Sequence, residues 1–211
     1  MPLTLAKVRT PLTSIVKRIF LNRSPDPLRG GPEHLDKKYV KGDFDYLWNI
    51  NELARFSLVA GYCQFLKQKG RILEVGCGES ILNQRLSPNY SYFLGIDTSS
   101  HAIKRAVARG CPNAEFVAAD AQTFVPEGRF DVIIFNDSLE YFHDPAGLVL
   151  RYEAYLDSTG LFIVCIFDGT LTRSASIWRS LETRYRLVDQ ARVFNSIRQS
   201  WRIAVLAPPV W

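Results

Sequence analysis

The stretch Arg71-Ile72-Leu73-Glu74-Val75-Gly76-Cys77-Gly78, residues 71–78, is an apolar run that ends in a glycine turn. A short apolar run bounded by glycine is typical of a buried strand in a parallel sheet. Apolar residues return at helical spacing at Ile81, Leu82 and Leu86, so we expect a helix near residues 79–86. Glycine has no Cβ and lets a ligand approach the main chain closely. Such a strand-turn-helix junction is where open α/β sheets bind nucleotides.

Acidic side chains stand at the ends of successive apolar runs. Glu74 lies just before the first glycine, Asp97 follows the run 92–96, and Asp120 follows the run 115–119. The separation of about 20 residues between the glycine turn and Asp97 fits an acid that binds ribose hydroxyls. Since parallel strands end at the same edge of a sheet, we expect these three carboxylates to lie along one edge.

Four motifs follow one another in a fixed order, and together they resemble class I S-adenosylmethionine-dependent methyltransferases, especially the small UbiE-like or type 11/12 group. The resemblance is strong over residues 70–167 and weak elsewhere. It implies an α/β fold with a Rossmann-like, doubly wound, seven-stranded sheet in the order 3-2-1-4-5-7-6, mostly parallel, with an antiparallel last strand and helices on both faces. The motifs are EVGCG (74–78), GIDTSSHAIKRA (95–106), FVAADAQTF (116–124) and FDVIIFNDSLEYFHDP (130–145).

The end of the chain fits this topology independently. We expect two strands there, at 186–194 and 200–206, separated by a turn at Asn195-Ser196. Strands with so short a connection must be antiparallel. Before them we expect a helix at 145–156 that Gly160 closes and a strand at 161–167.

S-adenosylmethionine is the cofactor that the resemblance implies. It places the first acid and the two glycines at the methionine half, the second acid at the ribose, and Asp120 with the Ala121 amide at the adenine. The backbone carbonyl of Asn136 is expected beside the sulfonium. The implied cofactor contacts are Glu74, Gly76, Cys77, Gly78, Asp97, Thr98, Asp120, Ala121, Asn136 and Asp137.

Other nucleotide ligands fit the glycine turn less well. A dinucleotide fingerprint needs a third Gly or Ala where this chain has Ile81, whose side chain would obstruct a pyrophosphate. No G-K-[ST] follows the turn, which excludes a P-loop. Ser80 stands where a third glycine of the methyltransferase turn is common, so the backbone contact there is open.

Residues for the acceptor side are less clearly marked. Tyr141 and His143, just past the fourth strand, are candidates to reach a substrate, with His143 either a general base or a surface residue. In related methyltransferases the segment before the helix 51–68 folds over the cofactor as a lid. Its aromatic residues are either lid residues or ordinary core residues. They are Tyr39, Tyr46 and Trp48.

The length of 211 residues fits one α/β domain. We divide it into a basic extension and Pro/Gly-rich linker at 1–32 and a methyltransferase domain at 33–211. Apolar residues at helical spacing predict a basic amphipathic helix at 11–22, which either contacts a membrane surface or partner or packs on its own domain. The central section 26–170 is net acidic, so the net charge of +5 does not argue for nucleic-acid binding.

The four cysteines show no C-x-x-C spacing, and with the three histidines they form no zinc motif. We therefore expect a cytoplasmic protein without a structural metal. The base-methylating [DN]-P-P-[YF] motif is absent after the fourth strand. The sequence favours transfer of a methyl group to oxygen or nitrogen of a small molecule such as a sugar or secondary metabolite. A cofactor-binding module without turnover, and an RNA or protein methyltransferase, are the alternatives. The oligomeric state is open.

Overall fold

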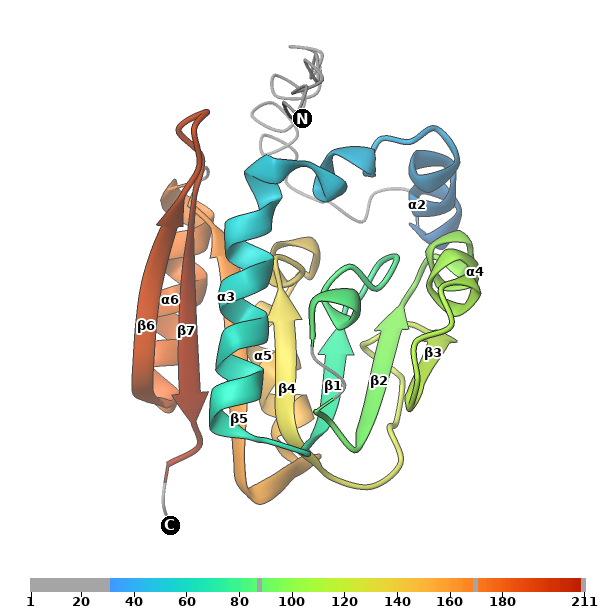
Figure 1. Ribbon diagram of the computed structural model, residues 1–211. Helices are drawn as coiled ribbons and strands as arrows, with labels where there is room; N and C mark the ends of the chain where they lie inside the picture. The colour runs from blue at the N-terminus through green and yellow to red at the C-terminus, as the bar shows by residue number, and fades with distance from the viewer. Residues whose placement is uncertain (1–30, 87–88, 169–170, 210–211) are drawn as a thin grey trace, which may run out of the picture.

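The computed structural model describes residues 31–86, 89–168 and 171–209 (Figure 1). In this part of the chain, seven strands form one sheet in the order β3-β2-β1-β4-β5-β7-β6. Neighbours from β3 to β5 are parallel, whereas β7 runs antiparallel to β5 and to β6. The predicted sheet order and its antiparallel last strand are confirmed. The strands are β1 (Arg71–Val75), β2 (Tyr92–Asp97), β3 (Ala114–Ala118), β4 (Phe130–Asn136), β5 (Leu156–Phe167), β6 (Arg186–Phe194) and β7 (Ser200–Ala207).

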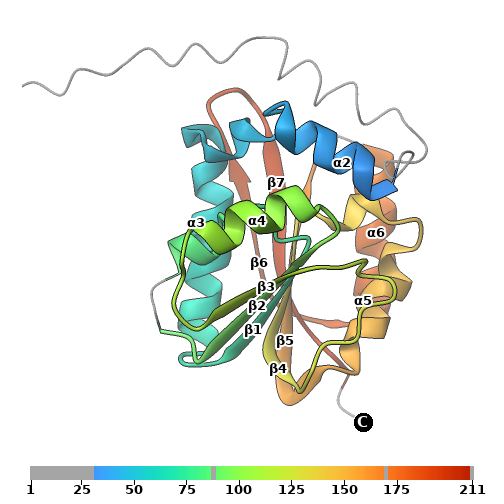
Figure 2. The same ribbon diagram turned by 90° about the vertical axis from the view of Figure 1, so that its right-hand side faces the viewer.

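Helices cover both faces of the sheet (Figure 2). Helix α3 packs on one face through Phe56, Val59 and Cys63, while α5 and α6 pack on the other through Val149 and Leu181. Burying one such side chain contributes roughly 1.5–3 kcal/mol. The helices are α2 (Gly31–Val40), α3 (Ile50–Leu66), α4 (Ser100–Ala108), α5 (Pro145–Glu153) and α6 (Leu171–Arg184), with short 3-10 turns η1 (Asp45–Trp48), η2 (Asn83–Arg85) and η3 (Leu139–Tyr141).

The central strands are apolar on both sides because each side faces a helix layer. In β1, Ile72 belongs to the core cluster under α3, and Leu73 belongs to the cluster under α5 and α6. Val132 and Ile133 of β4 alternate in the same way. Strands buried on both faces have near-continuous apolar sequences. This packing fixes the carboxyl ends of β1 and β4. The glycine turn follows β1, and Asn136 is the last residue of β4.

The predicted helix at 79–86 is wrong. Residues after the glycine turn form further turns and the short η2. Ser80 has a positive φ of 64°, which interrupts right-handed helical geometry. Asn83 then uses its side-chain amide to donate to the Tyr90 hydroxyl at 3.0 Å, seven residues further along the chain.

The predicted boundary between the fifth strand and its preceding helix also differs. Helix α5 ends at Glu153, and β5 already begins at Leu156, so Gly160 lies inside the strand. Phe130 pairs with Leu156, but Val132 pairs with Leu161, which makes 157–160 an irregular segment. Its exposed polar residues look like a loop in the sequence, although both ends pair with β4.

The predicted basic helix at 11–22 lies outside the described residues, as does most of the predicted extension 1–32. Helix α2 begins at Gly31, close to the predicted domain start. Among the described residues, no helix has the length and apolar character to cross a membrane. The same residues contain no group of His, Cys, Asp and Glu side chains suited to a metal ion.

Candidate functional site

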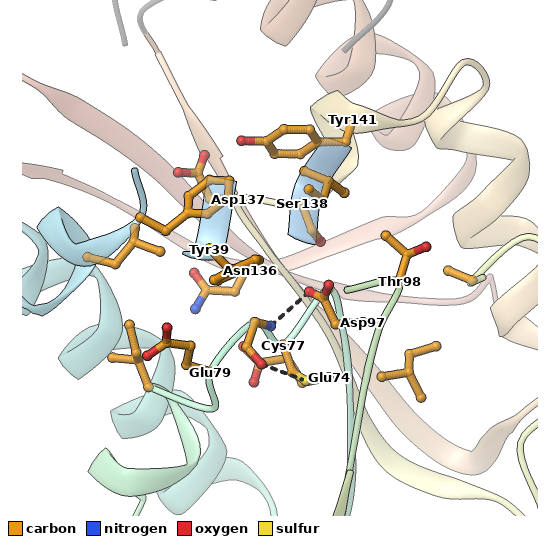
Figure 3. A pocket seen from close by; sticks show the side chains of 18 of the residues that line it. Tyr39, Glu74, Cys77, Glu79, Asp97, Thr98, Asn136, Asp137, Ser138 and Tyr141 are labelled. Atoms are coloured by element: carbon orange, nitrogen blue, oxygen red, sulfur yellow. Dashed lines mark hydrogen bonds between the residues drawn. The ribbon is translucent and has the colours of Figure 1, made fainter. Parts of the chain in front are cut away.

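A cavity of about 320 Å³ opens at the carboxyl ends of β1 to β4, with α2 and η1 along its other side. The structure brings every predicted cofactor contact to its wall, from Glu74 to Asp137. Figure 3 shows Glu74, Cys77 and Asp97 on one side of the cavity and Tyr141 across from them. The separate strand ends therefore line one cavity.

The glycine turn requires residues without side chains. Gly76 and Gly78 have φ values of 80° and 53°. A Cβ on Gly76 would lie 2.6 Å from the Ser138 Cβ, and a Cβ on Gly78 would lie 2.8 Å from the Tyr39 hydroxyl oxygen. Such distances are closer than real Cβ contacts. The turn is thus shaped by protein neighbours as well as by any ligand.

Ser80 adopts the conformation of the glycine that it replaces. It has a φ of 64°, is fully buried, and its hydroxyl has no hydrogen-bond partner among the described residues. A left-handed conformation costs a residue with a Cβ roughly 1–2 kcal/mol. The sequence departure at this position therefore preserves the turn at a cost in stability.

We expect Ser80→Gly to raise the free energy of unfolding by about 1 kcal/mol, because glycine adopts this φ without strain. Urea unfolding monitored by circular dichroism measures the change. Ser180→Gly, on the exposed side of α6, is the control, and it should lower stability by about 0.5 kcal/mol. If Ser80→Gly lowered the free energy of unfolding as much as Ser180→Gly, the assignment of strain to Ser80 would be contradicted.

Glu74 is a buried carboxyl group at the floor of the cavity. It is 2% exposed, and its Oε2 has no hydrogen-bond partner among the described residues. Burial raises the pKa of Glu74 to about 8, while the Asn136 amide and the Arg55 guanidinium act in the opposite direction. Near neutral pH this group is largely protonated, and a cationic ligand group beside it would stabilise its charged form.

Asp97 connects the end of β2 to the glycine turn. Its Oδ2 accepts from the Gly78 amide and its Oδ1 from the Ser99 amide, both at 2.9 Å (Figure 3 marks the first). Burial raises the pKa of Asp97, and these two amide hydrogen bonds lower it. Ser99 in turn caps α4 by accepting from the Ala102 amide, a role for which serine is well suited. One carboxylate thus sets both the turn and the start of α4.

Asp120 and Ala121 form the wall beyond β3. Asp120 is exposed, and its Oδ1 accepts from the Gln122 amide at 2.9 Å. The carbonyl oxygen of Ala121 accepts from the Tyr152 hydroxyl at 3.0 Å. This contact anchors the loop to α5, so the loop presents a fixed edge to the cavity.

Asp137 is held by neighbouring strands. It has a positive φ of 61°, its Oδ1 accepts from the Phe167 amide at 3.0 Å, and its Oδ2 accepts from the Trp201 indole at 3.2 Å. Its carboxylate therefore positions the end of β4. These bonds to β5 and β7 keep Asn136 and Ser138 facing the cavity and the glycine turn.

Arg55 is a cavity residue that sequence reasoning missed. It is 2% exposed; its Nε lies 2.6 Å from Glu52 Oε2, and its Nη1 donates to Asn136 Oδ1 at 2.7 Å. Buried arginines are rare unless they are paired. The signal in the sequence was an acid and a base three residues apart within an otherwise apolar helix. Arg55 thus places a buried guanidinium near the Glu74 carboxyl group, where its charge favours the ionised form of Glu74.

The proposed acceptor and lid residues divide into two groups. Tyr39, Tyr46 and Tyr141 line the cavity, whereas Trp48 and His143 do not. The Trp48 indole lies 3.3 Å from Glu79 Oε2, and its ring faces the Arg109 guanidinium at 4.2 Å. Trp48 therefore fastens η1 to the turn from outside.

His143 lies on the surface next to the start of α5. The following residue, Asp144, makes the helix cap by accepting from the Gly147 amide at 2.9 Å. The structure thus leaves His143 away from the cavity wall, and Tyr141 is the nearer of the two predicted acceptor residues.

Comparison with known proteins identifies the same family. The family described as methyltransferase domain matches residues 48–203. The ubiquinone biosynthesis O-methyltransferase of Pasteurella multocida is 28% identical over 152 residues, which is 65% of this chain and 60% of the relative. Nodulation protein S of Azorhizobium caulinodans is 26% identical over 162 residues, 69% of this chain and 78% of the relative. The chain spans less than two thirds of the Pasteurella protein.

Solved structures share the fold at low sequence identity. The N-methyltransferase NodS of Bradyrhizobium japonicum, solved with S-adenosylhomocysteine, has a TM-score of 0.69 and 18% identity, covering 93% of this chain and 99% of its own. The [4+2]-cyclase SpnF has a TM-score of 0.61 and 17% identity, covering 74% and 82%. The family match extends over most of this chain and agrees with the motif order. The chain therefore belongs to the methyltransferase-domain family, among the class I S-adenosylmethionine-dependent methyltransferases.

Proposed function

We propose that this chain binds S-adenosylmethionine and transfers its methyl group to an oxygen or nitrogen of a small molecule, such as a sugar or secondary metabolite. The observation that carries the proposal is the pair Glu74 and Arg55 beside the glycine turn. A buried carboxyl group and a buried guanidinium next to each other fit the ammonium and carboxylate of an amino acid. The unpartnered Glu74 Oε2 is the acceptor that an ammonium group would satisfy.

The remaining wall residues fit the nucleoside half of the same molecule. The Asp97 carboxylate keeps lone pairs for ribose hydroxyls in addition to its two amide bonds. Asp120 and the Ala121 amide are proposed to bind the adenine, and the Asn136 carbonyl is proposed to lie beside the sulfur. Gly76 and Gly78 leave the room between these groups.

When bound, the cofactor supplies a methyl group already activated on a cationic sulfur. The chain must then hold the acceptor in line with that methyl group and exclude water, which contributes several kcal/mol. Tyr39 and Tyr46 are proposed to form the lid of the cavity, and Tyr141 is proposed to orient the acceptor. His143, on the surface, has no part in this proposal. We also propose that the protein acts in the cytoplasm.

A specific observation supports a second function, a cofactor-binding protein without methyl transfer. SpnF, which is named as a [4+2]-cyclase, shares the fold. The fold and the cofactor pocket therefore do not by themselves fix the reaction.

We expect the purified chain to bind S-adenosylhomocysteine in titration calorimetry and to move a labelled methyl group from S-adenosylmethionine to a hydroxyl or amine in a panel of small acceptors. Binding without transfer to any acceptor class would favour the second function. Transfer to RNA or protein, with acceptor affinity that falls steeply with salt, would replace the small-molecule assignment. If the chain bound no S-adenosylhomocysteine, the proposal that it uses S-adenosylmethionine would be overturned.

A further inference from the structure

Helix α2 places the hydroxyl group of Tyr39 at the wall of the cavity. Tyr39 is 6% exposed and lines the cavity. Its hydroxyl oxygen lies over Gly78 of the glycine turn, at the wall of the cavity. A phenol hydroxyl in a mostly buried side chain usually bonds a partner, and a ligand in the cavity would lie within its reach.

The position of this hydroxyl over the turn is closely defined. A Cβ built on Gly78 would lie 2.8 Å from the Tyr39 oxygen, so the phenol rests against the main chain of the turn. Burial, followed by the charge of Asp97, raises the pKa of Tyr39 well above its usual value. The phenol is thus neutral and able to donate at every pH of interest. Its ring is supported from behind by Phe44, with centroids 4.5 Å apart.

Asp36, one helical turn before Tyr39, fixes α2 to the start of α4. Its carboxylate accepts from the Ser99 hydroxyl at 2.5 Å, the Ser100 hydroxyl at 3.1 Å and the His101 amide at 3.1 Å. The Ser99 hydroxyl bond is the largest cause that lowers the pKa of Asp36, so the group stays charged. A carboxylate is also favoured at the positive end of a helix.

These contacts share one face of α2, because residues three apart in a helix are neighbours. Asp36 grips α4, and Tyr39 reaches the glycine turn. We propose that Tyr39 is a further cofactor-contacting residue whose hydroxyl donates a hydrogen bond to the ribose–methionine part of the bound cofactor, and that Asp36 is the positioning residue that holds it there. This inference rests on the proposed cofactor site and adds the lid contact to it.

Tyr39→Phe tests the contact directly, because it removes the hydroxyl and keeps the ring. We expect its affinity for S-adenosylhomocysteine, measured by titration calorimetry, to fall roughly five- to tenfold, the value of one hydrogen bond. Tyr62→Phe is the matched control: the Tyr62 hydroxyl bonds Asp189 at 2.9 Å on β6, so its removal should leave affinity unchanged. Unfolding midpoints confirm that each variant is folded.

Asp36→Asn tests the positioning role. It should lower affinity for S-adenosylhomocysteine and speed dissociation, and in the Tyr39→Phe background it should have little further effect, because both changes act on one contact. Asp43→Asn, an exposed acid on the same segment, is its control. Additive losses would show that Asp36 acts only on the fold.

The two proposals fail in different ways. If the wild-type chain does not bind S-adenosylhomocysteine, the proposed function falls. If the wild type binds and folded Tyr39→Phe binds equally well, the cofactor site stands and the Tyr39 contact is overturned.

Discussion

Raising the pH from about 6 to about 7 is expected to strengthen binding of S-adenosylhomocysteine by roughly tenfold, through Glu74. The pKa of this carboxyl group is raised to about 8, so the free protein holds it protonated below that pH. An ammonium group beside it requires the charged form. Binding therefore releases a proton, and affinity rises as the proton concentration falls. Above about pH 8 the amino group of the ligand itself loses its proton, and the gain ends.

Calorimetry in two buffers with different ionisation enthalpies counts the released proton. Glu74→Gln should abolish the proton release and the pH slope, and should lower affinity at about pH 8 by at least tenfold. Glu127→Gln changes an exposed acid on the β3–β4 loop and serves as the control. A flat pH profile in the wild type would show that Glu74 does not face an ammonium group.

Replacing Asp97 by alanine should lower the affinity for S-adenosylhomocysteine by at least tenfold. The loss should be on the order of a hundredfold if the hydrogen bonds to both ribose hydroxyls are lost. The same change removes the acceptor for the Gly78 and Ser99 amides, so we also expect a loss of stability of roughly 2 kcal/mol. Asp97→Asn keeps one acceptor oxygen and should retain more of both properties. Titration and urea unfolding measure the two effects separately.

A second ligand separates ribose binding from amino-acid binding. 5′-Methylthioadenosine has the nucleoside but lacks the amino acid. Asp97→Ala should lower the affinity for both ligands to a similar extent, whereas Glu74→Gln should lower only the affinity for S-adenosylhomocysteine. If Asp97→Ala left 5′-methylthioadenosine binding unchanged in a folded protein, the ribose assignment would be wrong.

The residues at strand ends were predictable from the sequence, since each follows an apolar run in the chain. Glu74, Asp97 and Asn136 are fixed at one edge of the sheet as soon as β1, β2 and β4 are parallel neighbours. Chain order and strand direction suffice for that conclusion. The antiparallel ending followed in the same way from the short turn between β6 and β7.

Side chains on helices and turns were less predictable, because their direction depends on how each element packs. The 3.6-residue period marks the buried face of α3 but not that Arg55 on that face reaches Asn136. Trp48 turned outward because Glu79 and Arg109 hold it there. These partners are distant in sequence.

The sequence by itself determined the sheet order, the glycine turn and the acidic edge, because covalent order and strand periodicity specify them. Only the tertiary structure decided that Arg55 and Tyr39 enter the cavity, that Trp48 and His143 stay outside it, and that turns replace a helix after β1. Those outcomes depend on contacts between distant elements, such as Asp36 with the start of α4, and on the backbone angle of a single buried residue, Ser80.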